Sequence, residues 1–103
     1  MIDLKKTQKA IYDNKVKKGF NTTDVKLELL RIHGEVTEAF EAWHKGKDDF
    51  NEELADVAIY LLGLAEILHI DLEKEIKAKM EKNAKRKYKI VNGAARRIKE
   101  ANE

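Results

Sequence analysis

The sequence has no cysteine and no proline, and only five of its 103 residues are glycine. Without cysteine, the chain has neither a disulfide framework nor a thiolate metal site. The scarcity of proline and glycine removes the residues that most disfavour helices. Because alanine, leucine, glutamate and lysine are abundant, the composition predicts an all-α protein.

The sequence also lacks a long hydrophobic segment and a charge excess of one sign. Its longest apolar run, residues 57–65, has about half the length of a membrane span and is interrupted by Tyr60 and Gly63. The N-terminus shows no apolar segment of the kind found in secretory signals. The net charge of +2 does not argue for nucleic acid as a partner, which is therefore not expected. We therefore expect a single domain over residues 1–103, located in the cytoplasm, with about 90–103 as a C-terminal extension.

Apolar residues spaced three and four apart predict a bundle of four to five helices. The first two are expected over residues 3–17 and 24–45. A capping box of Asp49 and Glu52 is expected to open the third, which runs to about residue 69. The fourth follows Asp71, and its pattern weakens beyond Tyr88. Residues 90–91 fit a short extended piece, and residues 94–101 fit a terminal helix.

The third helix contains an anomaly, because Asp56 lies within an apolar stretch that is expected to be buried. A buried carboxylate without a partner costs several kcal/mol or takes up a proton. Three kinds of partner would compensate it: a basic side chain, a water-filled cavity or a metal ion.

Four acidic residues form two pairs with the same spacing. Glu35 and Glu38 are three residues apart on the second helix, and Glu53 and Asp56 are three apart on the third. Each pair projects from one helix face, and antiparallel packing of the two helices would bring the pairs together. Oxygen ligands without cysteine favour Mg²⁺ or Mn²⁺ over zinc. The alternative is that each pair belongs to a solvated helix face, as is common in chains rich in Glu and Lys.

Several segments in order resemble the MazG-like nucleotide pyrophosphohydrolases of the all-α NTP pyrophosphatase superfamily. That family carries an E-x-x-E motif followed by E-x-x-D, and here fourteen residues separate Glu38 from Glu53. The resemblance covers about residues 14–89 and includes the residue groups 34–39, 52–62, 70–73 and 79–83. It implies hydrolysis of a nucleoside or deoxynucleoside triphosphate to the monophosphate and pyrophosphate, with Mg²⁺ as cofactor and a role in cleaning the nucleotide pool.

The resemblance also assigns residues to the site. Glu35, Glu38, Glu53 and Asp56 would be the metal ligands and catalytic residues. Substrate contacts to phosphate or sugar would come from Lys79, Asn83 and Arg86. Tyr60 lies one turn beyond Asp56 and would stack on the base, or else be a core tyrosine with its hydroxyl at the rim.

Relatives of this kind assemble as dimers or tetramers, so a homo-oligomer is expected. Trp43 then fits the core or a subunit interface. Two other function classes stay open: a non-catalytic helical module that binds a nucleotide or a protein partner, and a nucleic-acid-binding protein that uses the basic C-terminal segment. Orthophosphate as the only product, or activity indifferent to EDTA, would exclude the pyrophosphohydrolase.

Overall fold

The computed structural model of the chain describes residues 2–98. Its elements, in order, are α1 (Leu4–Lys18), α2 (Val25–His44), α3 (Phe50–Ile67), α4 (Leu72–Lys85), β1 (Lys87–Val91) and β2 (Ala94–Ile98). The protein is mostly helical, which confirms the predicted all-α fold class. Among the described residues, no helix combines the length and apolar character needed to cross a bilayer. The chain forms two compact units, residues 1–73 and 74–103.

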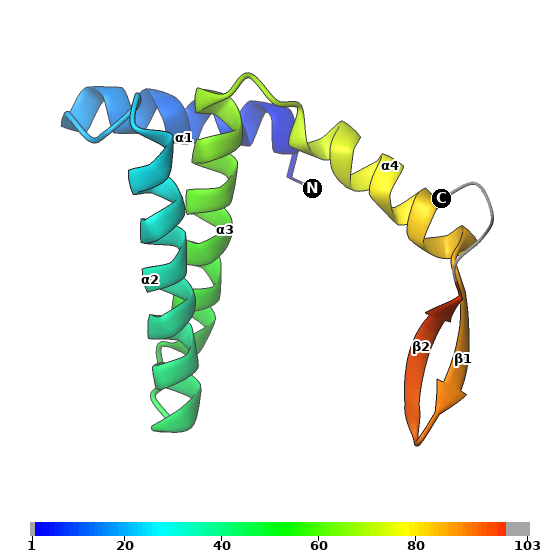
Figure 1. The fold of residues 1–103 in the computed structure, drawn as a ribbon. Coiled ribbons are helices and arrows are strands. Elements are labelled where there is room, and N and C mark those ends of the chain that lie inside the picture. The colour runs from blue at the N-terminus through cyan, green and yellow to red at the C-terminus, as the bar shows by residue number, and fades with distance from the viewer. Residues whose placement is uncertain (1, 99–103) are drawn as a thin grey trace. The chain divides into compact units, whose positions relative to one another are not determined.

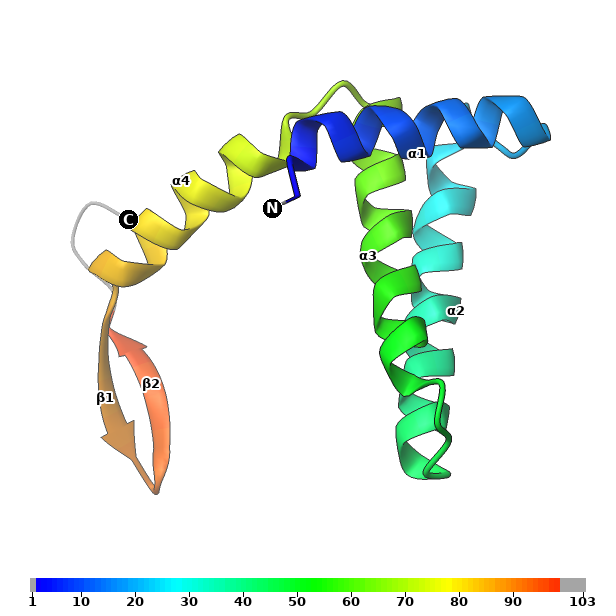
Figure 2. The same ribbon diagram turned by 180° about the vertical axis from the view of Figure 1, so that it is seen from behind.

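In the N-terminal unit, α2 and α3 lie side by side and run antiparallel, and α1 crosses them where α2 begins and α3 ends (Figure 1). The view from behind shows the same arrangement (Figure 2). Gly63 on α3 permits the crossing, because a Cβ atom there would lie 3.2 Å from Cγ2 of Ile11 on α1. The short connection between α2 and α3 explains why they are antiparallel neighbours.

Local capping explains where the first helices begin. The side chain of Asp3 accepts a hydrogen bond from the backbone N–H of Lys6, and Asp24 accepts one from Leu27, at 3.2 and 3.1 Å. Asp49 does precede α3, but its side chain makes no capping hydrogen bond. The predicted capping box is therefore wrong in its bonding, although the predicted helix start is right.

The apolar core of a single chain is small. Among the described residues, only Ala39, Ala42, Leu64 and Ala65 are apolar core residues with less than about a tenth of their surface exposed. The stretch around Asp56 is not buried as expected: Asp56 itself is exposed, and Leu54 and Leu61 are 50% and 44% exposed. The physical reason is that α1 and α2 are the helices that pack against α3 in this unit, which leaves much of its surface open.

Buried polar groups hold the N-terminal unit together. Gln8 is 1% exposed, and its Nε2 donates to the carbonyl of Ile70 at 2.9 Å and to Glu66 at 3.2 Å. Its Oε1 accepts from the backbone N–H of Leu72 at 3.0 Å, where α4 begins. This side chain therefore satisfies one of the free N–H groups that every helix start leaves without an intrahelical partner.

The C-terminal unit contains a β-hairpin where a terminal helix over residues 94–101 was expected. β1 and β2 pair antiparallel, and the turn between them is Asn92-Gly93, with φ of 53° and 77°. Two consecutive positive φ values suit the two-residue turns of hairpins, and Asn-Gly is the sequence that favours them most strongly. The helix prediction is thus wrong for residues 94–98, and residues 99–101 lie outside the described part of the chain.

Candidate functional site

Three carboxylates meet between α2 and α3. Glu35 and Glu38 come from α2 and Glu53 comes from α3, and one oxygen of each lies within 4.8 Å of the others. The i, i+3 spacing places the two α2 residues on one face, and the antiparallel packing brings α3 opposite them. The structure therefore joins side chains that are up to eighteen residues apart in the sequence.

The electrostatics of this cluster favour a bound cation. Desolvation is the main reason that the pKa of Glu35 is raised above its ordinary value of 4.5, and repulsion from Glu38, Asp56 and Glu53 adds to it. Desolvation, then Glu38, Asp49 and Asp56, raise the pKa of Glu53 in the same way. One oxygen each of Glu35 and Glu53 is buried without a hydrogen-bond partner among the described residues. A hard divalent cation would relieve the repulsion and supply the missing partner.

Asp56 borders this cluster. It lies outside the group of three whose oxygens are within 4.8 Å of one another. It is nevertheless close enough to raise the pKa of both Glu35 and Glu53 by repulsion. Asp56 is exposed, so this fourth carboxylate keeps contact with solvent.

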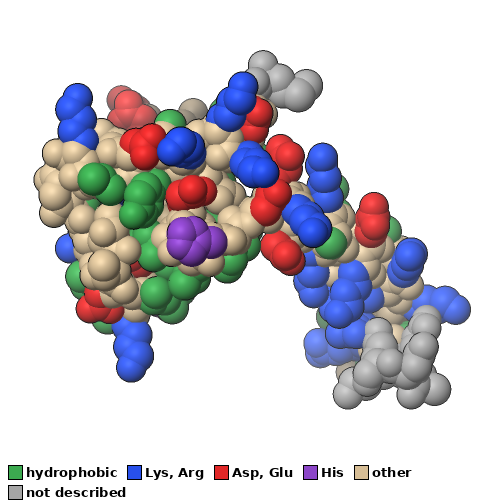
Figure 3. Space-filling view, turned by 90° about the horizontal axis from the view of Figure 1, so that it is seen from above, with side chains coloured by type: hydrophobic (Ala, Val, Ile, Leu, Met, Phe, Trp, Pro, Cys, Tyr) green, Lys and Arg blue, Asp and Glu red, His purple; other side chains and the backbone are tan. Residues whose placement is uncertain are grey.

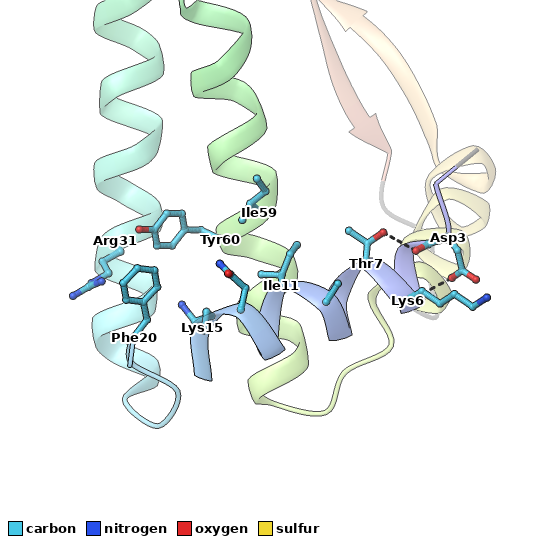
Figure 4. Close-up of a pocket in the computed structure, with 11 residues that line it drawn as sticks. Asp3, Lys6, Thr7, Ile11, Lys15, Phe20, Arg31, Ile59 and Tyr60 are labelled. Carbon is cyan, nitrogen blue, oxygen red and sulfur yellow. Dashed lines mark hydrogen bonds between the residues drawn. The ribbon is translucent and has the colours of Figure 1, made fainter. Parts of the chain in front are cut away.

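A cavity of about 690 Å³ lies in the same unit, a size typical of small-molecule sites. Its walls combine apolar side chains with Asn14, Lys15 and Arg31. Figure 4 shows Tyr60 reaching from α3 toward α2, with Phe20 nearby. Arg31 precedes Glu35 by four residues on α2, and Tyr60 follows Asp56 by four on α3, so the cavity begins one helical turn from the carboxylates.

A buried ion pair that the sequence did not predict lies beside this cavity. Lys15 of α1 bonds to Glu28 of α2, and the two residues are 7% and 0% exposed. The Lys15 ammonium also lies 5.5 Å from the centroid of the Tyr60 ring, within range of a cation–π attraction. Glu28 lies off the apolar stripe of its helix, so hydrophobic periodicity gave no sign of its burial.

The remaining predicted site residues lie in the C-terminal unit. Lys79 and Asn83 are on α4, and Arg86 follows directly after it. Nη1 of Arg86 donates a hydrogen bond to Oδ1 of Asn83 at 2.9 Å. Like charge on Arg86 is the main reason that the pKa of Lys79 is lowered, followed by desolvation and by Lys82 and Arg97.

The fold and the site define an all-α protein with a carboxylate cluster one helical turn from a cavity of about 690 Å³. Residues 23–100 match the MazG-like family, so the chain belongs to that family. Its general activity is nucleotide pyrophosphohydrolysis. Neither curated proteins nor solved structures give a significant match.

Proposed function

We propose that this protein hydrolyses a nucleoside or deoxynucleoside triphosphate to the monophosphate and pyrophosphate with the aid of Mg²⁺. The observation that carries the proposal is the cluster of Glu35, Glu38 and Glu53, with a cavity one helical turn away. A triphosphate carries about four negative charges and is repelled by carboxylates unless metal ions lie between them. The carboxylate cluster supports a metal site, and the cavity supports a site for the base.

The metal would be held by Glu35, Glu38, Glu53 and Asp56. When bound, Mg²⁺ or Mn²⁺ supplies charge neutralisation of the phosphates and acidifies a coordinated water. The unpartnered buried oxygens of Glu35 and Glu53 support this assignment.

The cavity would receive the base. Tyr60 and Phe20 line it and offer aromatic faces for stacking. Asn14 and Arg31 are further polar groups in its wall, and they provide hydrogen bonds for orientation. We further propose that Lys79, Asn83 and Arg86 bind phosphate or sugar, because their donors suit anionic oxygens.

We propose that the active form is a homo-oligomer, a dimer or a tetramer, that cleans the nucleotide pool of the cytoplasm. The exposed apolar side chains support assembly: Leu30, Phe40 and Trp43 on α2 are 67%, 65% and 71% exposed. Large exposed apolar patches mark interaction surfaces in soluble proteins.

A panel of NTPs and dNTPs with Mg²⁺, in which pyrophosphate and orthophosphate are separated, tests the activity. We expect pyrophosphate release that EDTA abolishes. Asp56→Ala and Glu53→Gln should lose it while keeping the helical circular dichroism signal. Glu52→Gln is the matched control, because Glu52 is the exposed neighbour of Glu53 on α3 and lies outside the cluster.

Orthophosphate as the only product, or turnover unaffected by EDTA, would refute the proposal. Thermal stabilisation by Mg²⁺ and nucleotide without any turnover would identify a non-catalytic nucleotide-binding module instead. Loss of the helical signal in Glu53→Gln would mean that this carboxylate serves the fold.

A further inference from the structure

The C-terminal unit has a strong positive charge that the net charge of the whole chain conceals. Residues 74–103 contain eleven Lys and Arg residues and four acidic ones, a formal net charge of +7. Residues 1–73 contain fifteen acidic and ten basic residues. Figure 3 shows Lys and Arg side chains gathered on the unit that contains α4. A basic surface of this density attracts anions.

The basic side chains of the hairpin lie on its two opposite faces. Arg97 on β2 lies opposite Tyr88 on β1, and Arg96 lies opposite Lys89. Side chains alternate along a strand, so Arg97 shares a face with Tyr88, whereas Arg96 is on the other face with Lys89. Removal of either arginine changes the charge of the hairpin equally but affects different faces.

Arg97 is close enough to the basic residues of α4 to interact with them electrostatically. The pKa of Lys79 is lowered by Arg86 first, then by desolvation, Lys82 and Arg97. The hydrogen bond from Arg86 to Asn83 holds the guanidinium near α4. In addition, Nε of Arg86 is buried and lacks a hydrogen-bond partner among the described residues. Cations gathered in this way repel one another, and an anion with several oxygens would satisfy them together.

We infer that Arg97 completes a phosphate-binding cluster with Lys79 and Arg86, and that the ligand is the triphosphate group of a nucleotide. The identity of this ligand rests on the proposed function. The Asn92-Gly93 turn thereby acquires a role, because it returns the chain so that β2 brings a third cation back to the end of α4. The family match extends to residue 100 and so includes Arg97, but the sequence motifs that assign substrate contacts end before it.

Binding of inorganic tripolyphosphate to the full chain, measured by calorimetry in EDTA, tests the inference without any contribution from a metal. Arg97→Ala is expected to weaken binding about tenfold, the effect of losing one charge-assisted contact. Arg96→Ala is the matched control and should change it less than about twofold. Arg97→Lys, which keeps the charge, should recover part of the loss. Circular dichroism verifies that each variant is folded.

Equal effects of Arg97→Ala and Arg96→Ala would overturn the inference, because they would reflect overall charge alone. Absence of tripolyphosphate binding by the unmodified chain would also overturn it. A single-stranded oligothymidylate that binds with strong salt dependence, and that tripolyphosphate does not displace, would assign the cluster to nucleic acid and refute a nucleotide ligand. Failure of the proposed function appears separately, as absence of pyrophosphate release in Mg²⁺ while Arg97-dependent binding persists.

Discussion

The buried pair between Lys15 and Glu28 gives the sharpest test of how the N-terminal unit is stabilised. The two residues are 7% and 0% exposed, so neither charge is screened by water. Removing one partner leaves the other charge buried and alone. Replacing both by apolar side chains removes the desolvation penalty together with the attraction. We therefore expect Lys15→Met and Glu28→Leu each to lower the free energy of unfolding when made alone. The double variant should be more stable than either single variant.

The magnitude follows from the burial. Breaking a buried pair on one side costs about 3–5 kcal/mol, while a domain of this size has a free energy of unfolding of roughly 5–15 kcal/mol. Each kcal/mol corresponds to roughly 4–8 °C in Tm for a small domain, so each single variant should lose more than about 10 °C. The second oxygen of Glu28 has no hydrogen-bond partner among the described residues. That unpaired oxygen adds to the penalty and makes the apolar replacement more favourable.

Urea denaturation followed by circular dichroism would measure the two single variants and the double variant. A control double-mutant cycle on α1 uses Lys9 and Asp13. Their side chains are 73% and 61% exposed, and Nζ of Lys9 lies 3.9 Å from Oδ2 of Asp13. An exposed pair of this kind should show little coupling. If the double variant at Lys15 and Glu28 is less stable than either single variant, the two charges do not compensate each other and the reasoning is wrong.

The other predictions concern the metal, the assembly and the helix crossing. Raised pKa values of Glu35 and Glu53 mean that the folded state binds more protons than the unfolded state above pH 4.5. In EDTA, their contribution to the free energy of unfolding should therefore fall as the pH rises through their raised pKa values. Adding Mg²⁺ should restore Tm at neutral pH. If Glu53→Gln leaves Tm in EDTA unchanged, the pH argument is contradicted. Trp43→Glu should shift the protein to a smaller species in light scattering, because this ring is 71% exposed in one chain. Gly63→Leu should lower Tm strongly, and Gly63→Ala should lower it less, because a single added Cβ already lies 3.2 Å from Cγ2 of Ile11, closer than ordinary van der Waals contact.

The helices could be predicted closely because their signals are local. Apolar spacing and the capping residues Asp3 and Asp24 lie within a few residues of each helix end, and the expected and observed boundaries of α1 and α2 differ by one residue. The hairpin was missed although its signal was also local. Asn92-Gly93 adopts positive φ at both positions, and this dipeptide between two apolar-containing segments predicts a hairpin turn. The terminal helix expected over residues 94–101 conflicts with this turn signal.

Part of the candidate site could likewise be predicted from local sequence signals, and part could not. The i, i+3 spacing of each acidic pair is visible in the sequence, so the pairing of Glu35 with Glu38 needed only helix geometry. Lys15 and Glu28 belong to different helices, and their bond depends on how α1 crosses the other two. No spacing rule within one helix predicts such a contact. The contact requires α1 to cross close to α3, which the absence of a side chain at Gly63 permits.

The apolar stripes of α2 and α3 are wider than the surface that the helices bury against one another within one chain. Among the described residues, Ala39, Ala42, Leu64 and Ala65 form the buried apolar core, whereas Phe40 and Trp43 on α2 are mostly exposed. A stripe wider than the contact it makes exposes apolar surface, at about 25 cal/mol for each Å² that stays in water. A second chain that covers this surface would recover that free energy. The width of the apolar stripe, rather than its period, is therefore the feature of the sequence that predicts assembly.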